Sequence, residues 1–318
     1  MGSRLGIYRL ATPVEPTSDT PKRNPCQLSL SPADIAWTDL GNPPTDPSHA
    51  LTVQWLGTAG YEFRYQGTTV LIDPYFSRIP LSQLLFKKAL IKQSVIERFI
   101  SDADAILVGH SHFDHVMDVP TIAQMTGATV YGSQSTSNLC MASGLTPEKI
   151  VTVPTRGLEF EVGPFRITAV PSEHSRFMFG RVPFEGDVPC SCELPMPGKS
   201  YRCGQVFNYH IQVGKRRIFH LGSANLIDDV FKSKDVDLVL LCAAGRQPTK
   251  NLAERVIRQV EPKRIIPMHY DNFFRGFDVD IKLLPLIKLA NLVDEIANVD
   301  TQIGVQTLEL MQRVTLDA

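Results

Sequence analysis

His110-Ser-His112-Phe-Asp114-His115 places three of the eight histidines of this 318-residue chain beside one carboxylate. Imidazole nitrogens and carboxylate oxygens are the ligands that Zn²⁺ and similar borderline metals take in proteins. His110 and His112 are two residues apart, so both can point the same way from an extended loop. A polar surface cluster is the alternative interpretation, but such a dense run of an uncommon residue favours a metal site.

A short buried strand is predicted directly before this run. Residues 102–109 read Asp-Ala-Asp-Ala-Ile-Leu-Val-Gly, a polar turn followed by apolar residues at 106–108 and a closing glycine. The metal-binding run therefore follows the C-terminal end of a strand. Layered α/β folds place their functional side chains at such ends.

The pattern on both sides of the run predicts two sheets flanked by helices. A three-stranded meander is expected at 51–56, 61–65 and 69–72, with glycine-containing turns between the strands. Apolar residues at approximately helical spacing predict one helix over 81–100. Lys87, Lys88 and Lys92 beside its apolar face fit a solvated helix face or, alternatively, a membrane surface. Later strands are expected at 165–170, 205–213, 217–221, 236–242 and 265–266, and a helix at 252–260.

Composition and charge are those of an ordinary globular enzyme. The formal net charge of −1 gives no electrostatic reason to expect a nucleic-acid partner. No run of about 18 apolar residues exists, so no transmembrane segment is expected. The N-terminus lacks a secretory apolar region, and we expect a cytoplasmic protein. Residues 1–50, rich in proline and short polar residues, are interpreted as an extended arm.

The six cysteines are expected to be reduced thiols, as in a cytoplasm. Cys190, Cys192 and Cys203 lie in one segment and offer an alternative small metal site. Their spacing matches no strong zinc pattern and no fourth ligand is evident, so incidental thiols in a loop are the favoured interpretation.

Three further motifs extend the pattern beyond the histidine run: Trp55-Leu-Gly-Thr-Ala-Gly60, Thr69-Val-Leu-Ile-Asp73-Pro74 and Arg264-Ile-Ile-Pro-Met-His269. With these motifs, residues 51–277 resemble the metallo-β-lactamase superfamily, whose signature is H-x-H-x-D-H. The branch that they resemble includes N-acylphosphatidylethanolamine phospholipase D and ascorbate-phosphate lactonase. The resemblance implies an α/β fold, a four-layer αββα sandwich, with a catalytic domain at 51–277. Residues 278–318 are then a C-terminal extension packing on that domain.

The resemblance also assigns the remaining ligands. His174, after the strand at 165–170, becomes the third ligand of a first metal with His110 and His112. His269, after the strand at 265–266, joins Asp114 and His115 at a second metal. His210 and His220 fall within predicted strands and are interpreted as half-buried structural residues.

The chain departs from the superfamily at one position. Relatives usually have Gly-Asp after the strand at 217–221, with the Asp bridging two metals, whereas this chain has Gly222-Ser223. A neutral hydroxyl is a poor ligand for a divalent ion and cannot supply the negative charge that helps two cations sit about 3.5–4 Å apart. Ser223 therefore predicts a single metal or a weakly held second one.

The ligand set predicts a metal-dependent hydrolase that uses metal-bound hydroxide. Zn²⁺ is the expected metal, one or two per chain, with Mn²⁺ or Fe²⁺ as alternatives. Asp114 is expected to orient the nucleophile or accept its proton. The expected substrate is a small or lipid-like molecule with a phosphodiester or lactone-type ester. The alternative is a metal-binding protein that kept the fold and lost turnover with the bridging carboxylate.

Substrate contacts are predicted from a segment that is long for a plain connection. Residues 176–203 carry aromatic residues, Met, Pro and Gly, which suits a lid over an apolar substrate portion or, equally, a loop packed on the core. Phe179 and Tyr201 are the candidate contacts in it. Arg246 follows a strand expected to end near the metals and is a candidate for binding a phosphate or carboxylate, with a surface arginine in a turn as the slightly favoured interpretation.

Overall fold

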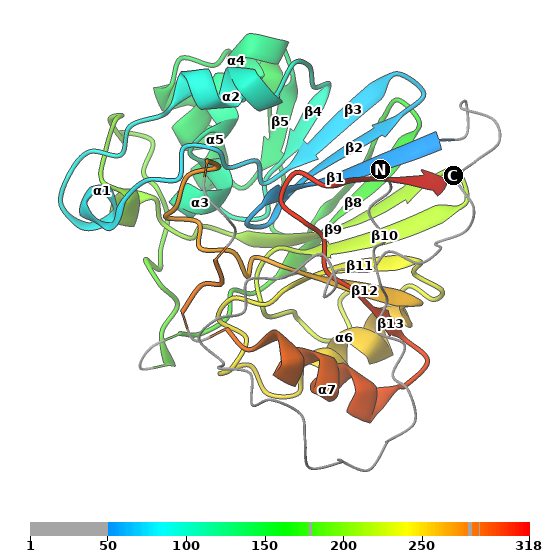
Figure 1. Ribbon diagram of the computed structural model, residues 1–318. Helices are drawn as coiled ribbons and strands as arrows, with labels where there is room; N and C mark the ends of the chain where they lie inside the picture. Colours follow the sequence, from blue (N-terminus) through cyan, green and yellow to red (C-terminus); the bar gives the residue numbers. More distant parts are fainter. Residues whose placement is uncertain (1–49, 178–179, 279–281, 286) are drawn as a thin grey trace.

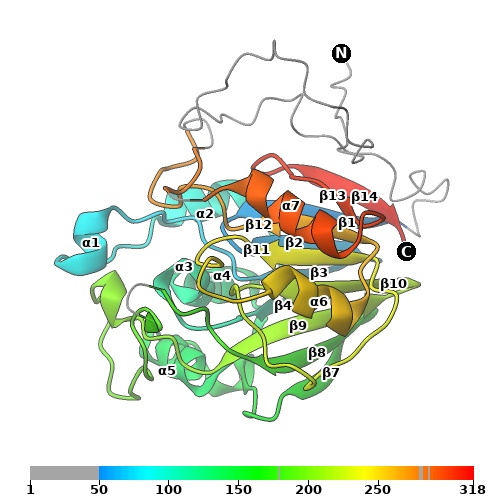
Figure 2. The same cartoon turned by 90° about the horizontal axis from the view of Figure 1, so that it is seen from below.

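Two seven-stranded sheets pack face to face in the computed structural model, which describes residues 50–177, 180–278, 282–285 and 287–318 (Figures 1 and 2). The N-terminal arm predicted at 1–50 therefore lies outside the described residues, apart from Ala50. No helix of the described residues is both long and apolar enough to cross a membrane.

The first sheet positions the metal-binding run, which follows its strand β4. Its order is β14-β1-β2-β3-β4-β5-β6. The meander β1–β3 is antiparallel, as predicted, and β3–β6 run parallel. The strands are Ala50–Gly57 (β1), Gly60–Tyr65 (β2), Thr68–Ile72 (β3), Ala105–Leu107 (β4), Thr129–Gly132 (β5), Ile150–Thr152 (β6) and Arg313–Asp317 (β14).

The second sheet supplies the later ligand positions from its strand ends. Its order is β13-β12-β11-β10-β9-β8-β7. The strands are Leu158–Val162 (β7), Phe165–Ser172 (β8), Val206–Val213 (β9), Arg216–Leu221 (β10), Leu238–Cys242 (β11), Arg264–Met268 (β12) and Gly304–Val305 (β13). All five strands predicted in this half of the chain are present.

Helices cover the two outer faces, so the fold is the expected αββα sandwich (Figure 1). The helices Gln93–Phe99 (α2), Val119–Thr126 (α4) and Gln134–Ala142 (α5) lie on the first sheet, and Leu252–Val260 (α6) and Leu289–Val299 (α7) lie on the second. One hydrophobic core fills the space between the sheets and under α6 and α7, and another lies beneath α2, α4 and α5. Both sheets are thus fixed on both faces, which makes their strand ends rigid supports for a site.

The single helix predicted over 81–100 is wrong. The segment forms two short helices, Leu81–Leu85 (α1) and Gln93–Phe99, with an irregular stretch between them. In that stretch the Ala89 N–H donates to the Met196 carbonyl and the Lys92 N–H donates to the Ser77 hydroxyl, both at 2.9 Å. These tertiary hydrogen bonds replace the helical ones, which the apolar spacing alone cannot indicate.

The last forty residues contribute one strand to each sheet. β14 pairs antiparallel with β1, and β13 pairs parallel with β12. α7 packs beside α6 (Figure 2). Each sheet therefore has one edge strand from this part of the chain, and the first strand of the fold is covered by the last.

A buried ion pair ties the segment after β12 to the segment after β3. Arg78 Nη2 lies 2.6 Å from Asp271 Oδ2, and both side chains are nearly fully buried. Asp271 Oδ1 also accepts the Thr58 N–H at 2.9 Å. The pair stabilises the chain two residues beyond His269, so it holds a candidate ligand in place as well as the fold.

Asp271→Ala is expected to lower the free energy of unfolding by about 3–5 kcal/mol, because it leaves the Arg78 charge buried and unpaired. Chemical denaturation of the purified variant measures this. The matched control is Asp278→Ala, which removes an exposed partner of Arg98 and is expected to leave stability near that of the parent. Equal, small losses in both variants would show that the buried pair contributes little.

Candidate metal centre

The loops at the ends of three strands bring the predicted ligands together. His110 and His112 follow β4, and the short helix Phe113–Val116 (α3) carries Asp114 and His115. His174 follows β8 in the other sheet, and His269 follows β12. The centre therefore lies where the ends of the two sheets meet.

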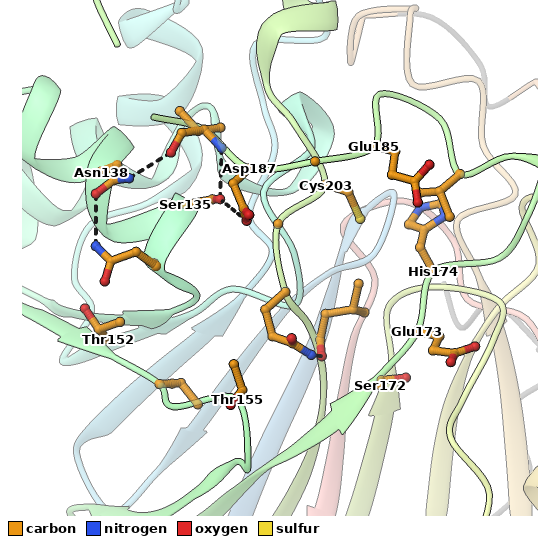
Figure 3. A pocket seen from close by; sticks show the side chains of 18 of the residues that line it. Ser135, Asn138, Thr152, Thr155, Ser172, Glu173, His174, Glu185, Asp187 and Cys203 are labelled. Atoms are coloured by element: carbon orange, nitrogen blue, oxygen red, sulfur yellow. Dashed lines mark hydrogen bonds between the residues drawn. The ribbon is translucent and has the colours of Figure 1, made fainter. Parts of the chain in front are cut away.

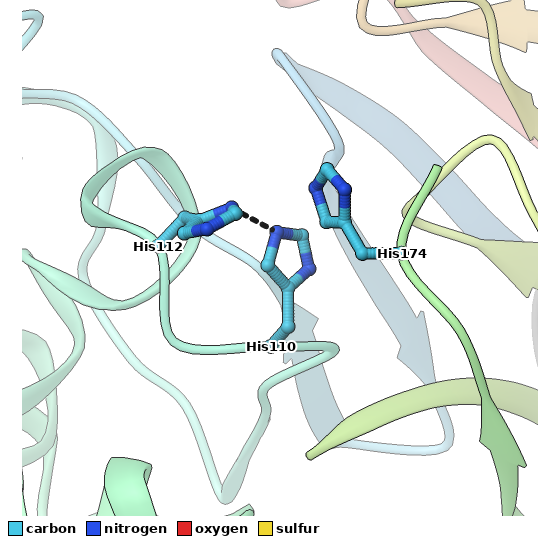
Figure 4. A group of neighbouring side chains, drawn as sticks. All are labelled: His110, His112 and His174. Carbon is cyan, nitrogen blue, oxygen red and sulfur yellow. Dashed lines mark hydrogen bonds between the residues drawn. The ribbon is translucent and has the colours of Figure 1, made fainter. Parts of the chain in front are cut away.

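The first ligand group consists of His110, His112 and His174 (Figure 4). Their candidate ligand atoms all lie within 4.8 Å of one another. His110 Nε2 and His112 Nδ1 are 2.9 Å apart. The three rings are nearly perpendicular to one another in pairs, with centroids 4.6–4.8 Å apart. Such convergence of ring nitrogens fits a shared transition-metal ion.

The second ligand group consists of Asp114, His115 and His269, with ligand atoms within the same 4.8 Å limit. His269 Nε2 lies 3.2 Å from Asp114 Oδ2, and His115 Nε2 lies 4.0 Å from it. The His110 and His115 ring centroids are only 3.8 Å apart, so the two groups adjoin each other. The geometry therefore offers neighbouring positions for two ions.

The outer nitrogens of three rings are already fixed by hydrogen bonds. His112 Nε2 donates to the Pro183 carbonyl at 2.8 Å, and His174 Nδ1 donates to the Ser175 carbonyl at 2.7 Å. His115 Nδ1 donates to Asp73 Oδ2 at 2.8 Å. Each bond selects the tautomer whose other nitrogen has a free lone pair facing the centre. Metal-binding histidines are held in this way, so the rings fit a metal before it binds.

Burial keeps the first group neutral. Desolvation lowers the pKa of His112 to about 3 and that of His174 to about 4, and neighbouring imidazoles add to the shift for each. The pKa of His110 is well below its ordinary value for the same reasons. Neutral imidazole is the form that binds a metal, so these three residues fit the role at neutral pH.

The second group keeps its negative charge. Burial alone would raise the pKa of Asp114, but the neighbouring His115 and His269 outweigh it and hold the pKa well below the ordinary value. Burial alone would lower the pKa of His115, but the carboxylates of Asp73 and Asp114 raise it. A cation at this position therefore meets a buried carboxylate that is ionised at neutral pH.

Asp73 supports the candidate centre, and the sequence analysis quoted it in a motif but gave it no role. It follows β3, it is fully buried, and it accepts hydrogen bonds from His115 Nδ1 and from the Gly109 N–H at 2.7 Å. A Cβ at Gly109 or at Gly222 would lie within 2.9 Å of Asp73 Oδ2. Both glycines are therefore needed to admit this carboxylate. Its position directly after a strand was the signal in the sequence.

Asp73→Asn is expected to weaken metal binding at the second group by about 10–100-fold, because the amide no longer supplies the charge that orients His115. Metal retained after dialysis against a graded chelator series measures it. Asp104→Asn is the control, since Asp104 accepts a hydrogen bond at the opposite end of β4, from the Thr69 N–H. Equal retention by both variants would remove Asp73 from the centre.

Ser223 lies beside the two groups and lines the same cavity. It is 3% exposed, and its hydroxyl oxygen accepts the Ser175 N–H at 3.0 Å. The hydroxyl thus supports the backbone next to His174. No carboxylate other than Asp114 lines this cavity among the described residues.

An apolar cavity of about 500 Å³ opens onto both ligand groups. Its wall combines aromatic and aliphatic side chains from four parts of the chain: Leu84, Phe113, Phe177, Val182, Phe184, Phe273, Phe274 and Leu284. Phe184 packs edge-on against the His112 ring, with centroids 6.1 Å apart. Phe177 and residues 181–184 therefore form part of the cavity wall beside the centre.

A polar cavity of about 910 Å³ lies on the other side of His174 (Figure 3). Glu173, Glu185 and Asp187 contribute carboxylates to it. Its hydrogen bonds hold the predicted lid segment to α5: Ser135 Oγ donates to Asp187 and accepts from the Val188 N–H, and Asn138 donates to the Val188 carbonyl. Residues near 187 and 188 are thus anchored, whereas Phe177 and residues 181–184 line the cavity beside the metal ligands.

Two of the predicted substrate contacts, Arg246 and Tyr201, do not line the apolar cavity. Arg246 turns away to Glu295 on α7, with Nη1 2.5 Å from the carboxylate. Binding of a phosphate or carboxylate by Arg246 would require its ion pair with Glu295 to break. Tyr201 is 3% exposed within the core beneath the outer helices of the first sheet. Phe179 lies outside the described residues.

The cysteines and the two strand histidines stay apart from the centre. Cys190, Cys192 and Cys203 are free, and they are in neither of the metal-ligand groups found among the described residues. His210 lies in β9 and His220 in β10, as predicted. His220 Nε2 donates to the Ala59 carbonyl at 2.8 Å, which is a structural role.

Comparison with known proteins gives the family. Residues 52–269, more than half of the chain, match the family described as Beta-lactamase superfamily domain. The chain belongs to this superfamily. Relatives with similar sequences include a UPF0173 metal-dependent hydrolase of Polynucleobacter asymbioticus, 28% identical over 226 residues, which are 69% of this chain and 73% of that protein. A UPF0173 protein of Pyrococcus furiosus is 26% identical over 225 residues, 70% of this chain and 85% of that protein.

A solved structure shares the fold. Igni18, a metallo hydrolase from the archaeon Ignicoccus hospitalis, aligns with a TM-score of 0.52 at 15% identity, covering 85% of this chain and 99% of that one. The family match, the relatives and the clustered ligands together identify an enzyme, a metal-dependent hydrolase of the metallo-β-lactamase superfamily.

Proposed function

We propose that this enzyme hydrolyses a lactone-type ester that carries an apolar group. The observation that carries this proposal is the apolar cavity lying directly over both ligand groups. An apolar chain or ring in that cavity removes hydrocarbon surface from water, which favours binding by about 25 cal/mol per Å². The scissile group then lies beside the histidines.

The charge of the cavity favours a neutral ester over a phosphodiester. Among the described lining residues Arg181 is the one permanently cationic side chain, and it is exposed. Arg246 is committed to Glu295. A phosphodiester anion would therefore find few fixed positive charges apart from the metal. A lactone needs none in the ground state, which supports it as the first candidate and a phosphodiester as the second.

The ligand residues have separate roles in the proposed reaction. His110, His112 and His174 would hold one ion tightly, and Asp114, His115 and His269 would hold a second ion more weakly. A bound ion supplies a water of lowered pKa and polarises the ester oxygen. Asp114, ionised at neutral pH, accepts a hydrogen bond from the attacking water and orients it, or takes its proton. The apolar side chains exclude other water from the reacting group.

Zn²⁺ is the proposed metal, because a set of three neutral imidazoles suits it and leaves its full charge on the ion. Two imidazoles with one carboxylate, the second group, also suit Fe²⁺. Elemental analysis of the protein as purified from cells decides between Zn²⁺, Mn²⁺ and Fe²⁺.

Hydrolysis of a lactone series with lengthening alkyl substituents tests the substrate class, with bis-p-nitrophenyl phosphate assayed alongside. We expect kcat/KM to rise with chain length until the cavity is filled and to exceed that for the phosphodiester. Phe184→Ala should flatten the chain-length trend, whereas Met141→Ala, an exposed residue on α5, should not. Faster phosphodiester turnover with no chain-length trend would overturn the lactone proposal.

A further inference from the structure

An exposed apolar patch lies at the outer end of the molecule, next to the apolar cavity. Five large apolar side chains of the segment 81–91 are exposed, by 38–81% of their surface: Leu81, Leu85, Phe86, Leu90 and Ile91. Half of the ten exposed large apolar residues of the described chain thus fall within eleven consecutive positions. Apolar surface concentrated in this way marks an interaction site.

The patch is separated from the body of the fold. α1 lies away from both sheets, at one edge of the molecule (Figures 1 and 2). Leu84, on the inner side of α1, lines the apolar cavity, and so does Phe177, which is 42% exposed. The segment that carries the patch therefore also contributes to the wall of the cavity.

The charged residues within the segment of the patch are all lysines. Lys87, Lys88 and Lys92 lie within or directly after it, and Lys199 lies 6.0 Å from the Phe86 ring centroid. No acidic residue occurs from 81 to 96. Within the described part of the chain Lys87, Lys88 and Lys199 form no salt bridge, whereas Lys92 interacts electrostatically with the buried Asp118.

We propose that this patch docks the enzyme onto an anionic lipid surface, with the side chains of 81–91 entering the headgroup region and the lysines contacting lipid phosphates. Apolar residues beside a cluster of lysines fit the two parts of such an interface. Docking in this way would face the mouth of the cavity toward the lipid. This binding does not depend on the hydrolytic reaction.

Cosedimentation of the full-length protein with vesicles tests the proposal. We expect binding to equimolar phosphatidylcholine and phosphatidylglycerol, weaker binding to phosphatidylcholine alone, and loss of the difference at high salt. Phe86→Ser with Leu90→Ser should lower binding by about tenfold. Lys87→Glu with Lys88→Glu should lower binding to the anionic vesicles by at least about tenfold. The matched controls are Met141→Ser and Lys250→Glu, which change exposed residues elsewhere and should bind as the parent does.

Two further variants identify other occupants. Phe86→Trp should show a blue shift of its emission on adding anionic vesicles; an emission already blue-shifted and unchanged by vesicles means that this chain covers the patch itself and overturns the proposal. A dimer that Phe86→Ser with Leu90→Ser disperses would assign the patch to a second copy and also overturn it. The proposal is also overturned if the protein does not bind vesicles, or if the patch variants and the control variants bind vesicles equally. His112→Ala should bind vesicles as the parent does, so failure of the proposed hydrolysis remains a separate result.

Discussion

The His112→Ala variant is expected to lower kcat/KM for the best lactone by about a thousandfold or more, with loss of the metal held by His110 and His174. Removing one of three imidazoles opens the first group, and a bound ion contributes several kcal/mol to transition-state stabilisation, where each 1.4 kcal/mol is a factor of ten. Metal content after dialysis and steady-state kinetics measure the two effects.

His210→Ala is the matched control, because His210 lies in β9 and its ring packs at a tilt against Phe231, with ring centroids 5.0 Å apart. It should keep its metal and most of its activity. A His112→Ala variant that is folded by circular dichroism and retains parental metal would remove this residue from the ligand set. Parental activity in this variant would also remove His112 from the ligand set, even if the metal content were altered.

Ser223→Asp is expected to raise the metal content from about one to about two ions per chain and to increase the rate about tenfold or more. Ser223 stands beside both groups, so a carboxylate at this position can contact ions in both and reduce their mutual repulsion. An Asp oxygen can also accept the Ser175 N–H that the serine oxygen now accepts. Elemental analysis of dialysed protein, together with kinetics, measures the outcome.

The isosteric control is Ser223→Asn, which has the same shape as Asp without the charge and should leave the metal content unchanged. A parent enzyme that already holds two full equivalents would contradict a weakened second group. The same conclusion would follow if Ser223→Asp were folded and bound no additional metal, which would indicate a site adapted to the serine.

Most of the fold could be predicted, because the strands have strong local signals. The meander at 50–72 and the later strands alternate or run as continuous apolar stretches between glycines, and α6 has a regular apolar face. The helix predicted over 81–100 failed where local spacing and tertiary contacts disagree. Its apolar residues at 81, 85 and 91 are exposed rather than buried, so their spacing did not reflect a core-facing surface.

The candidate ligands could be selected from the sequence through the resemblance, whereas their supporting contacts could not. Asp73 lies 42 residues before His115, and only the pairing of β3 with β4 brings the two together. Arg246 is a candidate contact from the sequence that does not line the cavity in the structure. A strand end near the metals suggested an anion grip, but Glu295, from a helix that the sequence analysis did not predict, takes its guanidinium.

The pairing of β1 with β14 has a consequence for synthesis on the ribosome. Gln54 and Arg313, which pair across these strands, are 259 residues apart. During translation β1 is therefore synthesised long before β14. Until β14 is available, one row of the backbone N–H and C=O groups of β1 stays unpaired. An open strand edge of this kind is a template for association with other chains. Nascent chains stalled before residue 313 should thus depend on chaperones to stay monomeric, and the last strand to emerge should release that dependence.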